Sequence, residues 1–138
     1  MNGFQLLEHT ADMGIAAQGE TLAELFRQMA LGLRQIITSC AMIRPEIDVE
    51  VDVSGKDGEE LLVNWLGELV FLLETRQFLF AEIDIRELTG HSLKARLRGE
   101  TYDPERHYLE REIKAVTYHQ VKLEAAAEGW AAQVYVDL

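Results

Sequence analysis

The sequence predicts an α+β fold, in which two helices pack on one face of a mainly antiparallel sheet within a single domain. Residues 21–38 and 57–73 carry apolar side chains at helical spacing. Several shorter segments alternate apolar with polar residues, as half-buried strands do. After residue 80, two pairs of such segments are joined by short turns, which is typical of antiparallel hairpins. At 138 residues the chain has the usual length of one domain, so we expect a single domain over 1–138.

The chain begins with two short predicted strands, GFQLLE and GIAAQ, around a loop at residues 9–14. Asp12 and Gly14 favour a turn in that loop. Thr21 and Glu24 then form a capping-box pattern, which marks the start of a helix. Six apolar residues follow at helical spacing and predict a helix over about 21–38: Leu22, Leu25, Phe26, Met29, Leu33 and Ile36.

The middle of the chain predicts a strand and a second helix. Residues 47–53 alternate in a period of two, with Asp48, Glu50 and Asp52 on one face, so we expect a half-buried strand with a solvated acidic face. Asp57 with Glu60 repeats the capping pattern. A wide apolar stripe follows, with Glu68 at its edge: Leu61, Leu62, Trp65, Leu66, Leu69, Val70 and Leu73.

Two hairpins complete the predicted sheet. In the first, side-chain parity favours a three-residue loop, Thr89-Gly90-His91, over a two-residue loop. The longer loop places apolar residues opposite each other and charged residues opposite each other. It predicts the pairs Ile85 with Ala95, Asp84 with Arg96, and Glu82 with Arg98.

The second hairpin runs from about Lys114 to the C-terminus and turns near residues 126–129. Its apolar faces match only if the turn has an even number of residues, which predicts Tyr118 opposite Asp137. Lys114 has the parity of Tyr118, so we expect it on the same face as Asp137. Four residues of strand would separate Lys114 from Tyr118, a length of about 13 Å.

The composition excludes several classes of function. With 24 acidic and 13 basic residues the net charge is -11, so we expect no tight direct binding to nucleic acid. The single cysteine, Cys40, has no internal partner for a disulfide, and the first residues show no export signal, so we expect a cytoplasmic protein. The most apolar stretch, 61–73, is shorter than the roughly 20 residues that span a bilayer, so we expect no membrane segment.

Common catalytic motifs are missing from the sequence. There is no GxxxxGK phosphate loop, no GxSxG elbow and no GxGxxG turn, so nucleotide hydrolysis by this chain alone is not expected. The histidines are scattered and show no zinc-binding spacing: His9, His91, His107 and His119. His9 in the first loop is more often a structural residue than a ligand.

Oxygen ligands at the two ends of the chain are the remaining candidates for chemistry. The side chain of Asp137 and the terminal carboxylate of Leu138 lie within one residue, and such hard donors suit Ca²⁺ or Mg²⁺. Asp12 is a further candidate, although a turn aspartate more often bonds its own backbone. A solvated, frayed terminus is the usual fate of a chain end. Lys114 could contact a phosphate or could simply be exposed.

Four segments of the sequence resemble the archease family. FQLLEHTADMGIAAQGETLAELF is similar to the HTADIG signature and TLEEAF-like helix start of the family, with Met13 replacing isoleucine. LLVNWLGELVFLLET resembles the Trp-containing central helix. GETYDPERHYLEREIKAVTYHQVKLE is similar to the pattern GExYDPxRH followed by KAVTYH, and VYVDL carries the penultimate aspartate. The resemblance runs from Phe4 to Leu138.

The resemblance implies a fold related to the strand-helix-strand-strand module, with a metal site at one end of the sheet. The positions that match the metal ligands are Asp12, Asp137 and Leu138, and the matching functional lysine is Lys114. It also implies that the chain is not itself an enzyme. Its role would be to activate an RtcB-type RNA ligase in tRNA splicing and RNA repair, by promoting GTP-dependent guanylylation of the ligase and multiple turnover.

Two other classes of function stay open from the sequence. A general chaperone or modulator of RNA-processing proteins would act without metal and on many clients. An autonomous metal-dependent phosphohydrolase is the least favoured, because the sequence shows no evident base or nucleophile.

Overall fold

The computed structural model describes residues 1–8, 11–39 and 42–138. In chain order the elements are β1 (Gly3–Glu8), β2 (Asp12–Gly19), α1 (Leu22–Ile37), β3 (Ile47–Ser54), α2 (Gly58–Arg76), β4 (Phe78–Leu88), β5 (Ser92–Thr101), β6 (Ala115–Val116), β7 (Lys122–Ala126) and β8 (Gly129–Asp137). All strand pairs are antiparallel. The predicted α+β class is therefore confirmed.

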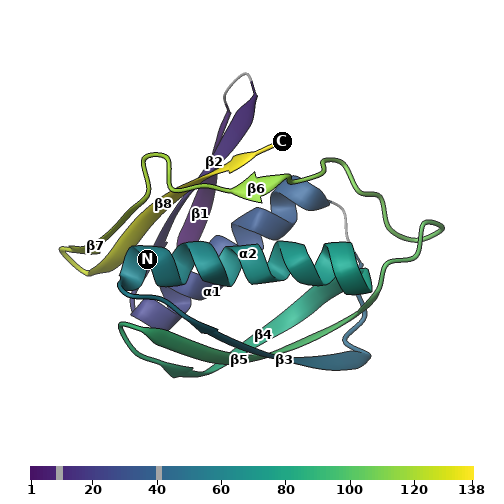
Figure 1. The fold of residues 1–138 in the computed structure, drawn as a ribbon, viewed down its shortest axis with the longest axis horizontal. Coiled ribbons are helices and arrows are strands. Elements are labelled where there is room, and N and C mark those ends of the chain that lie inside the picture. The colour runs from purple at the N-terminus through teal and green to yellow at the C-terminus, as the bar shows by residue number, and fades with distance from the viewer. Residues whose placement is uncertain (9–10, 40–41) are drawn as a thin grey trace.

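The strands form two sheets rather than the single predicted sheet. The first sheet has the order β1-β2-β8-β6, with β7 also paired to β8, and the second has the order β3-β5-β4. The two helices lie between the sheets (Figure 1). The prediction of one sheet was wrong because α2 buries eight residues, including Val63 and Leu72, which spread too widely around the helix for one sheet to cover.

Local signals set the starts of both helices as predicted. The Thr21 hydroxyl accepts a hydrogen bond from the Glu24 N–H at 3.1 Å, and the Asp57 carboxylate accepts one from the Glu60 N–H at 2.8 Å. The last turn of α2 ends at Gln77, which adopts the left-handed conformation with φ 53°. The helices are joined in the core by Trp65, whose Nε1 donates to the Phe26 carbonyl at 3.0 Å.

The β4–β5 hairpin has the predicted register but a different turn. The predicted pairs Ile85–Ala95, Asp84–Arg96 and Glu82–Arg98 are all present. However, Leu88 pairs with Leu93, and the Thr89 N–H donates to the Ser92 carbonyl at 2.9 Å, so the turn itself is tighter than predicted. The register shifts between Ile85 and Glu87. The extra residue is therefore a β-bulge in β4, and the three-residue loop was wrong.

The outer face of the second sheet is charged and balanced within the sheet. Asp48 accepts hydrogen bonds from Arg96 at 2.6 Å and from Arg98 at 3.0 Å. The hydrogen bond from Arg96 is the main cause of a lowered pKa at Asp48. Glu50 and Asp52 lie opposite Arg96 and Lys94. These acidic side chains are exposed, which fits the expected solvated face.

The C-terminal hairpin agrees with the prediction near its turn and departs from it farther away. Ala126 pairs with Gly129, so the turn has an even number of residues as predicted. Beyond β7 the register changes, because Ala115 lies opposite Asp137. Residues 117–121 lie outside β6 and β7, although the Thr117 N–H still donates to the Tyr135 carbonyl at 3.0 Å, and Gln120 within them has φ 51°. The predicted pairing of Tyr118 with Asp137 was therefore wrong.

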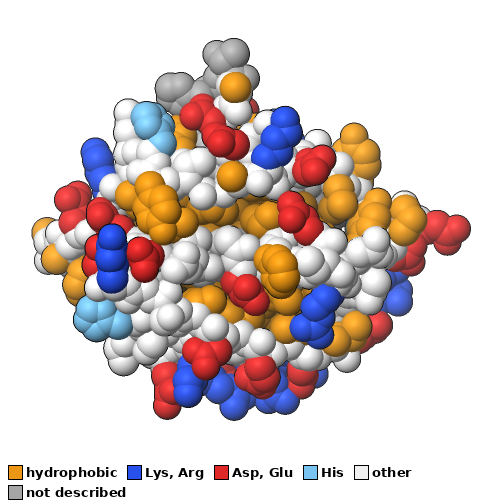
Figure 2. Space-filling view, viewed as in Figure 1, with side chains coloured by type: hydrophobic (Ala, Val, Ile, Leu, Met, Phe, Trp, Pro, Cys, Tyr) orange, Lys and Arg blue, Asp and Glu red, His pale blue; other side chains and the backbone are white. Residues whose placement is uncertain are grey.

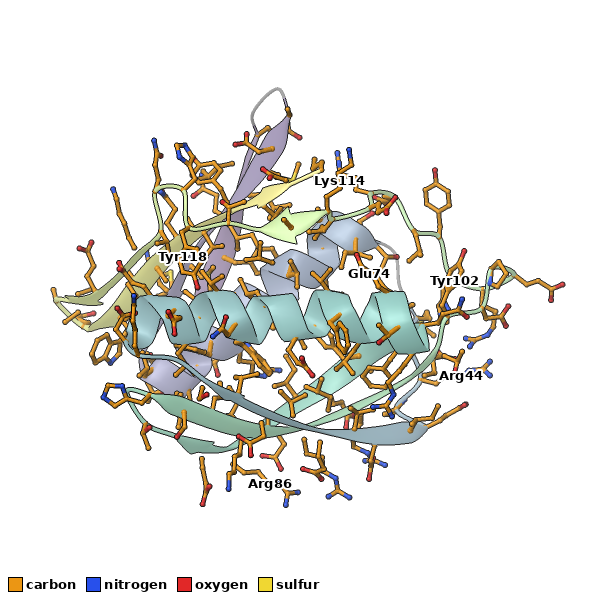
Figure 3. The ribbon with its side chains drawn as sticks, viewed as in Figure 1. Arg44, Glu74, Arg86, Tyr102, Lys114 and Tyr118 are labelled. Carbon is orange, nitrogen blue, oxygen red and sulfur yellow. The ribbon has the colours of Figure 1, made fainter. Side chains whose placement is uncertain are left out.

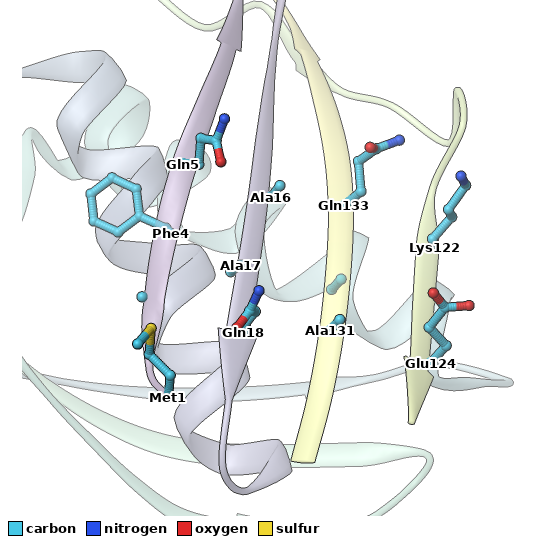
Figure 4. A pocket seen from close by; sticks show the side chains of 12 residues that line it. Met1, Phe4, Gln5, Ala16, Ala17, Gln18, Lys122, Glu124, Ala131 and Gln133 are labelled. Atoms are coloured by element: carbon cyan, nitrogen blue, oxygen red, sulfur yellow. The ribbon is translucent and has the colours of Figure 1, made fainter. Parts of the chain in front are cut away.

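Figure 4 shows the face of the first sheet that points away from α1. It forms a shallow hollow of about 420 Å³. Glutamines and alanines supply most of its centre, with Lys122 and Glu124 at the β7 side: the central residues are Gln5, Ala16, Gln18, Ala131 and Gln133. The opposite face packs on α1 and contributes Ile15 and Val134 to the core, both 0% exposed.

Candidate metal site

Asp12 and Asp137 lie directly opposite each other across β2 and β8. Directly opposed residues of an antiparallel pair point to the same face, with Cβ atoms about 4.5–5.5 Å apart. The next pair, Met13 with Val136, is buried in the core at 4% and 0% exposure. Asp12 and Asp137 consequently share the outer face of the first sheet, where the start of β2 lies beside the end of β8.

Asp12 is part of a strand and not of the predicted turn. It is the first residue of β2, so the predicted loop at 9–14 was too long by three residues at its end. The turn interpretation, in which this carboxylate bonds its own backbone, loses its basis. His9, which belongs to the same sequence motif, lies outside the described residues.

The C-terminus is held by backbone hydrogen bonds. The Leu138 N–H donates to the Ala11 carbonyl at 3.4 Å, and the Asp137 carbonyl accepts from the Lys114 N–H at 2.9 Å. Leu138 is also partly buried against the core. These contacts argue against a frayed end and fix the terminal carboxylate next to Asp137 in space as well as in sequence.

Lys114 comes close to Asp137 in a different way from the predicted one. Ala115, and not Tyr118, lies opposite Asp137, so the register from which the shared face was predicted is absent. Lys114 precedes β6, so strand parity does not assign its side chain to a face. The 13 Å of strand predicted between Lys114 and Tyr118 does not separate Lys114 from Asp137, because the Lys114 N–H bonds the Asp137 carbonyl directly. Figure 3 shows Lys114 beside the carboxyl end of β8. Its side chain is exposed and has no ion pair within the described part of the chain.

The donor set suits a hard cation only in part. Two opposed aspartates and the carboxylate of Leu138 offer oxygen ligands alone, which is the chemistry that Ca²⁺ and Mg²⁺ prefer. Over residues 1–8, 11–39 and 42–138, no group of three or more His, Cys, Asp or Glu side chains could hold an ion. Water or a partner protein would therefore have to complete the coordination shell.

A buried polar cluster that sequence reasoning missed lies at the start of the segment leading to Lys114. The side chain of Glu100 is buried, with 4% exposure. Its carboxylate accepts hydrogen bonds from the Arg44 N–H at 2.6 Å and from His107 Nε2 at 3.1 Å, and it forms an ion pair with Arg106. Burial alone would raise the pKa of Glu100. The three hydrogen bonds and the charge of Arg106 outweigh burial and lower that pKa to about 2.

The cluster fixes the segment between β5 and β6. His107 Nδ1 accepts from the Asp103 N–H at 2.9 Å, which leaves Nε2 as the donor to Glu100. Farther along, the Glu110 N–H donates to the Ile37 carbonyl at 2.7 Å. The signal for this cluster was present in the sequence as the GExYDPxRH pattern, which contains Glu100, Asp103, Arg106 and His107.

Comparisons with known proteins agree with the resemblance of the sequence. The model of the Archease protein family (MTH1598/TM1083) matches residues 4–138. Protein archease from Methanosarcina mazei is 45% identical over 139 residues, covering 98% of this chain and 95% of the relative. Protein archease from Pyrococcus furiosus is 36% identical over 142 residues, with both chains fully covered.

Solved structures show the same fold. The solution structure of Methanobacterium thermoautotrophicum protein 1598 has a TM-score of 0.82 and 31% identity, with 99% of each chain covered. A Thermotoga maritima archease, described as a possible chaperone, has a TM-score of 0.55 and 20% identity, covering 96% of this chain and 94% of its own. Within the described residues, neither helix has the length and apolar character needed to cross a membrane. From the family match and these relatives, the chain belongs to the archease family.

Proposed function

We propose that this chain binds one hard divalent cation, Ca²⁺ or Mg²⁺, and activates an RtcB-type RNA ligase in tRNA splicing and RNA repair. Asp12, Asp137 and the carboxylate of Leu138 would be the ligands supplied by this chain. The observation that carries the proposal is the direct opposition of Asp12 and Asp137 across β2 and β8. Like charges in that position destabilise a sheet unless something neutralises them, and a bound cation would do so.

An incomplete coordination shell fits an activator better than a self-contained enzyme. The site lies on the outer face of the first sheet, at the end of β8 and the start of β2, where a partner could supply further ligands. Lys114 lies at the same corner of the molecule, and its exposed ammonium has no ion pair with any described residue, which suits contact with the ligase or with a phosphate of its nucleotide. The ligase would carry the covalent guanylate, and this chain would promote guanylylation and multiple turnover without binding RNA tightly.

The net charge supports a protein partner rather than direct RNA binding. At -11, the chain as a whole repels the phosphate backbone, so contact with RNA would have to pass through the ligase. The acidic β3 side chains lie opposite basic residues of β5, which balances the charge on that face of the second sheet.

The central test is multiple-turnover RNA ligation by a purified ligase of this type, with and without this chain. Asp137→Asn should abolish the stimulation, because it removes one of the two opposed charges. The fold should stay intact, because Asp137 is exposed. Asp52→Asn is the matched control, since Asp52 is an equally exposed strand aspartate on the second sheet, and it should stimulate like wild type. Full stimulation by Asp137→Asn would overturn the metal assignment.

The general-chaperone alternative gives a different outcome in the same assay. It predicts stimulation that survives a chelator, together with protection of unrelated clients from aggregation. The Thermotoga relative is described as a possible chaperone, which makes this comparison worthwhile.

A further inference from the structure

A second hollow lies on the outward side of α2. It has a volume of about 580 Å³, in the range of ligand and side-chain pockets. We name it the α2 groove. Its lining residues come from β3, α2, β6 and the segment after β6: Val53, Ser54, Val63, Asn64, Gly67, Glu68, Phe71, Val116 and Tyr118. Figure 2 shows this side of the molecule, where apolar side chains gather over α2 between charged rims.

The groove exposes two aromatic side chains to water. Phe71 and Tyr118 are each 54% exposed, although most large apolar residues of α2 are buried. Scattered exposed apolar residues need no explanation, but two aromatic residues lining one concave surface with three valines form a patch of the kind that marks interaction sites. Aromatic residues are also enriched among the residues that dominate binding energy.

Gly67 lines the groove, and internal packing does not require a glycine at this position. Gly67 lies in the interior of α2, where glycine destabilises a helix relative to alanine. A Cβ added at Gly67 would meet nothing within 4 Å, so no neighbouring residue of the described chain needs the space. The opening above Gly67 is therefore available to a side chain from another molecule.

The groove has one charged residue, and that charge is unpaired. Glu68 is half-buried and forms no hydrogen bond or ion pair with the described residues, and no basic side chain lines the groove. Burying a carboxylate without a partner is unfavourable, so an occupant has to bring a cation. Phe71, three residues after Glu68 on the same helix face, adds an aromatic surface that also favours a cation.

The groove comes close to Lys114 along the chain. Val116 lines the groove and belongs to β6, in which Ala115 lies opposite Asp137. Two residues of extended chain, about 6.6 Å, separate Val116 from Lys114. A protein that contacted Lys114 would thus reach the groove without any change in this chain.

From these observations we infer that the α2 groove is a docking surface for the partner ligase, which inserts an apolar side chain over Gly67 and an adjacent arginine or lysine toward Glu68. This inference rests on the proposed function, because it takes the same ligase as the occupant. It adds the surface that gives affinity, whereas the metal site and Lys114 give activation.

The test is the affinity of the purified ligase for full-length variants, measured by calorimetry at saturating Ca²⁺. Gly67→Trp fills the groove, and Glu68→Lys reverses its charge. Each of the two substitutions should raise the Kd for the ligase about tenfold or more, because loss of one central contact typically has an effect of that size. At saturating concentrations, both variants should still stimulate guanylylation to the wild-type maximum, because they leave the metal site and Lys114 intact.

The matched controls are Gly67→Ala, which adds only a Cβ, and Glu128→Lys, which makes the same charge change at an exposed position away from the groove. Both should bind within about twofold of wild type. Phe71→Ala, at an exposed position, gives a second groove variant should Gly67→Trp fail to fold, as judged by circular dichroism.

The outcomes separate the two proposals. If wild type binds and stimulates the ligase but all groove variants bind equally well, the docking inference is overturned and the proposed function stands. If wild type neither binds nor stimulates the ligase, both fail together. If light scattering instead shows a wild-type dimer that the groove variants dissociate, with ligase affinity unchanged, a second copy occupies the groove and the inference is overturned.

Discussion

Glu100 is a buried carboxylate whose hydrogen-bond donors come from two different segments. Arg44 precedes β3, whereas Arg106 and His107 follow β5. The sequence places these residues in a recognisable pattern, but periodicity cannot show that they bond each other, because the contact with Arg44 spans 56 residues. Sequence reasoning therefore found the pattern and missed its structural role.

The lowered pKa of Glu100 predicts a specific loss of stability in acid. Its folded pKa is about 2, below the ordinary value of 4.5, so its contribution is complete above pH 4.5 and is lost as the pH falls toward 2. Between pH 5 and pH 2.5, we expect the free energy of unfolding of wild type, measured with urea, to fall by about 1–3 kcal/mol more than that of Glu100→Gln. The Gln variant controls for the other carboxylates. Parallel pH profiles would show that Glu100 does not contribute in this way.

The candidate site residues show the same division between local and distant information. The sequence supplied Asp12, Asp137, Leu138 and Lys114 through a family resemblance, and the structure brings the first two together. Sequence reasoning did not predict the position of Lys114 relative to Asp137. Side-chain parity was counted through residues 117–121, which lie outside both β6 and β7. A register carried along a strand is valid only while the strand is continuous.

The helices were predictable because their signals are local. Capping residues and apolar periodicity lie within a few positions of each helix end, and the observed bounds of α1 agree within a residue with the predicted 21–38. The β4–β5 hairpin was harder. Parity requires one extra residue between Ile85 and Ala95 but does not say where it lies, and here it is a bulge in β4 instead of a loop residue.

Two glycines in the helices predict opposite responses to the same substitution. Gly67→Ala in α2 meets no neighbour, so it should raise the free energy of unfolding by about 0.5–1 kcal/mol through helix propensity alone. Gly32→Ala in α1 gains the same propensity, but its Cβ would come 2.6 Å from Ile15 Cγ2, so it should destabilise the protein. Chemical denaturation of both variants checks the signs. A shift in the same direction for both would contradict the packing argument.

At the scale of the whole molecule, the two-sheet arrangement depends on contacts that no local pattern contains. The first sheet joins β2, near one end of the chain, to β8 at the other end. The second sheet closes β3 onto β5, with α2 and β4 between them in sequence. Alternating segments predicted the strands, but they did not predict which strands share a sheet. The wide apolar surface of α2 was the available indication that one sheet would not suffice.

If the opposed pair Asp12 and Asp137 binds a cation as proposed, we expect the stability of the whole fold to depend on divalent cations, because the pair joins β2, near one end of the chain, to β8 at the other end. A cation that binds only the folded protein raises its stability, by about 2.7 kcal/mol at a concentration 100 times the Kd. Millimolar Ca²⁺ or Mg²⁺ should therefore raise the Tm of wild type, compared with NaCl at the same ionic strength.

Asp12→Asn should remove this increase and should make the metal-free protein more stable by about 0.2–1 kcal/mol, since it removes the repulsion between opposed carboxylates. Asp52→Asn, on the second sheet, should keep the wild-type response. A Tm that is insensitive to Ca²⁺ and Mg²⁺ in wild type, or equally sensitive in Asp12→Asn, would show that the opposed pair does not hold a cation.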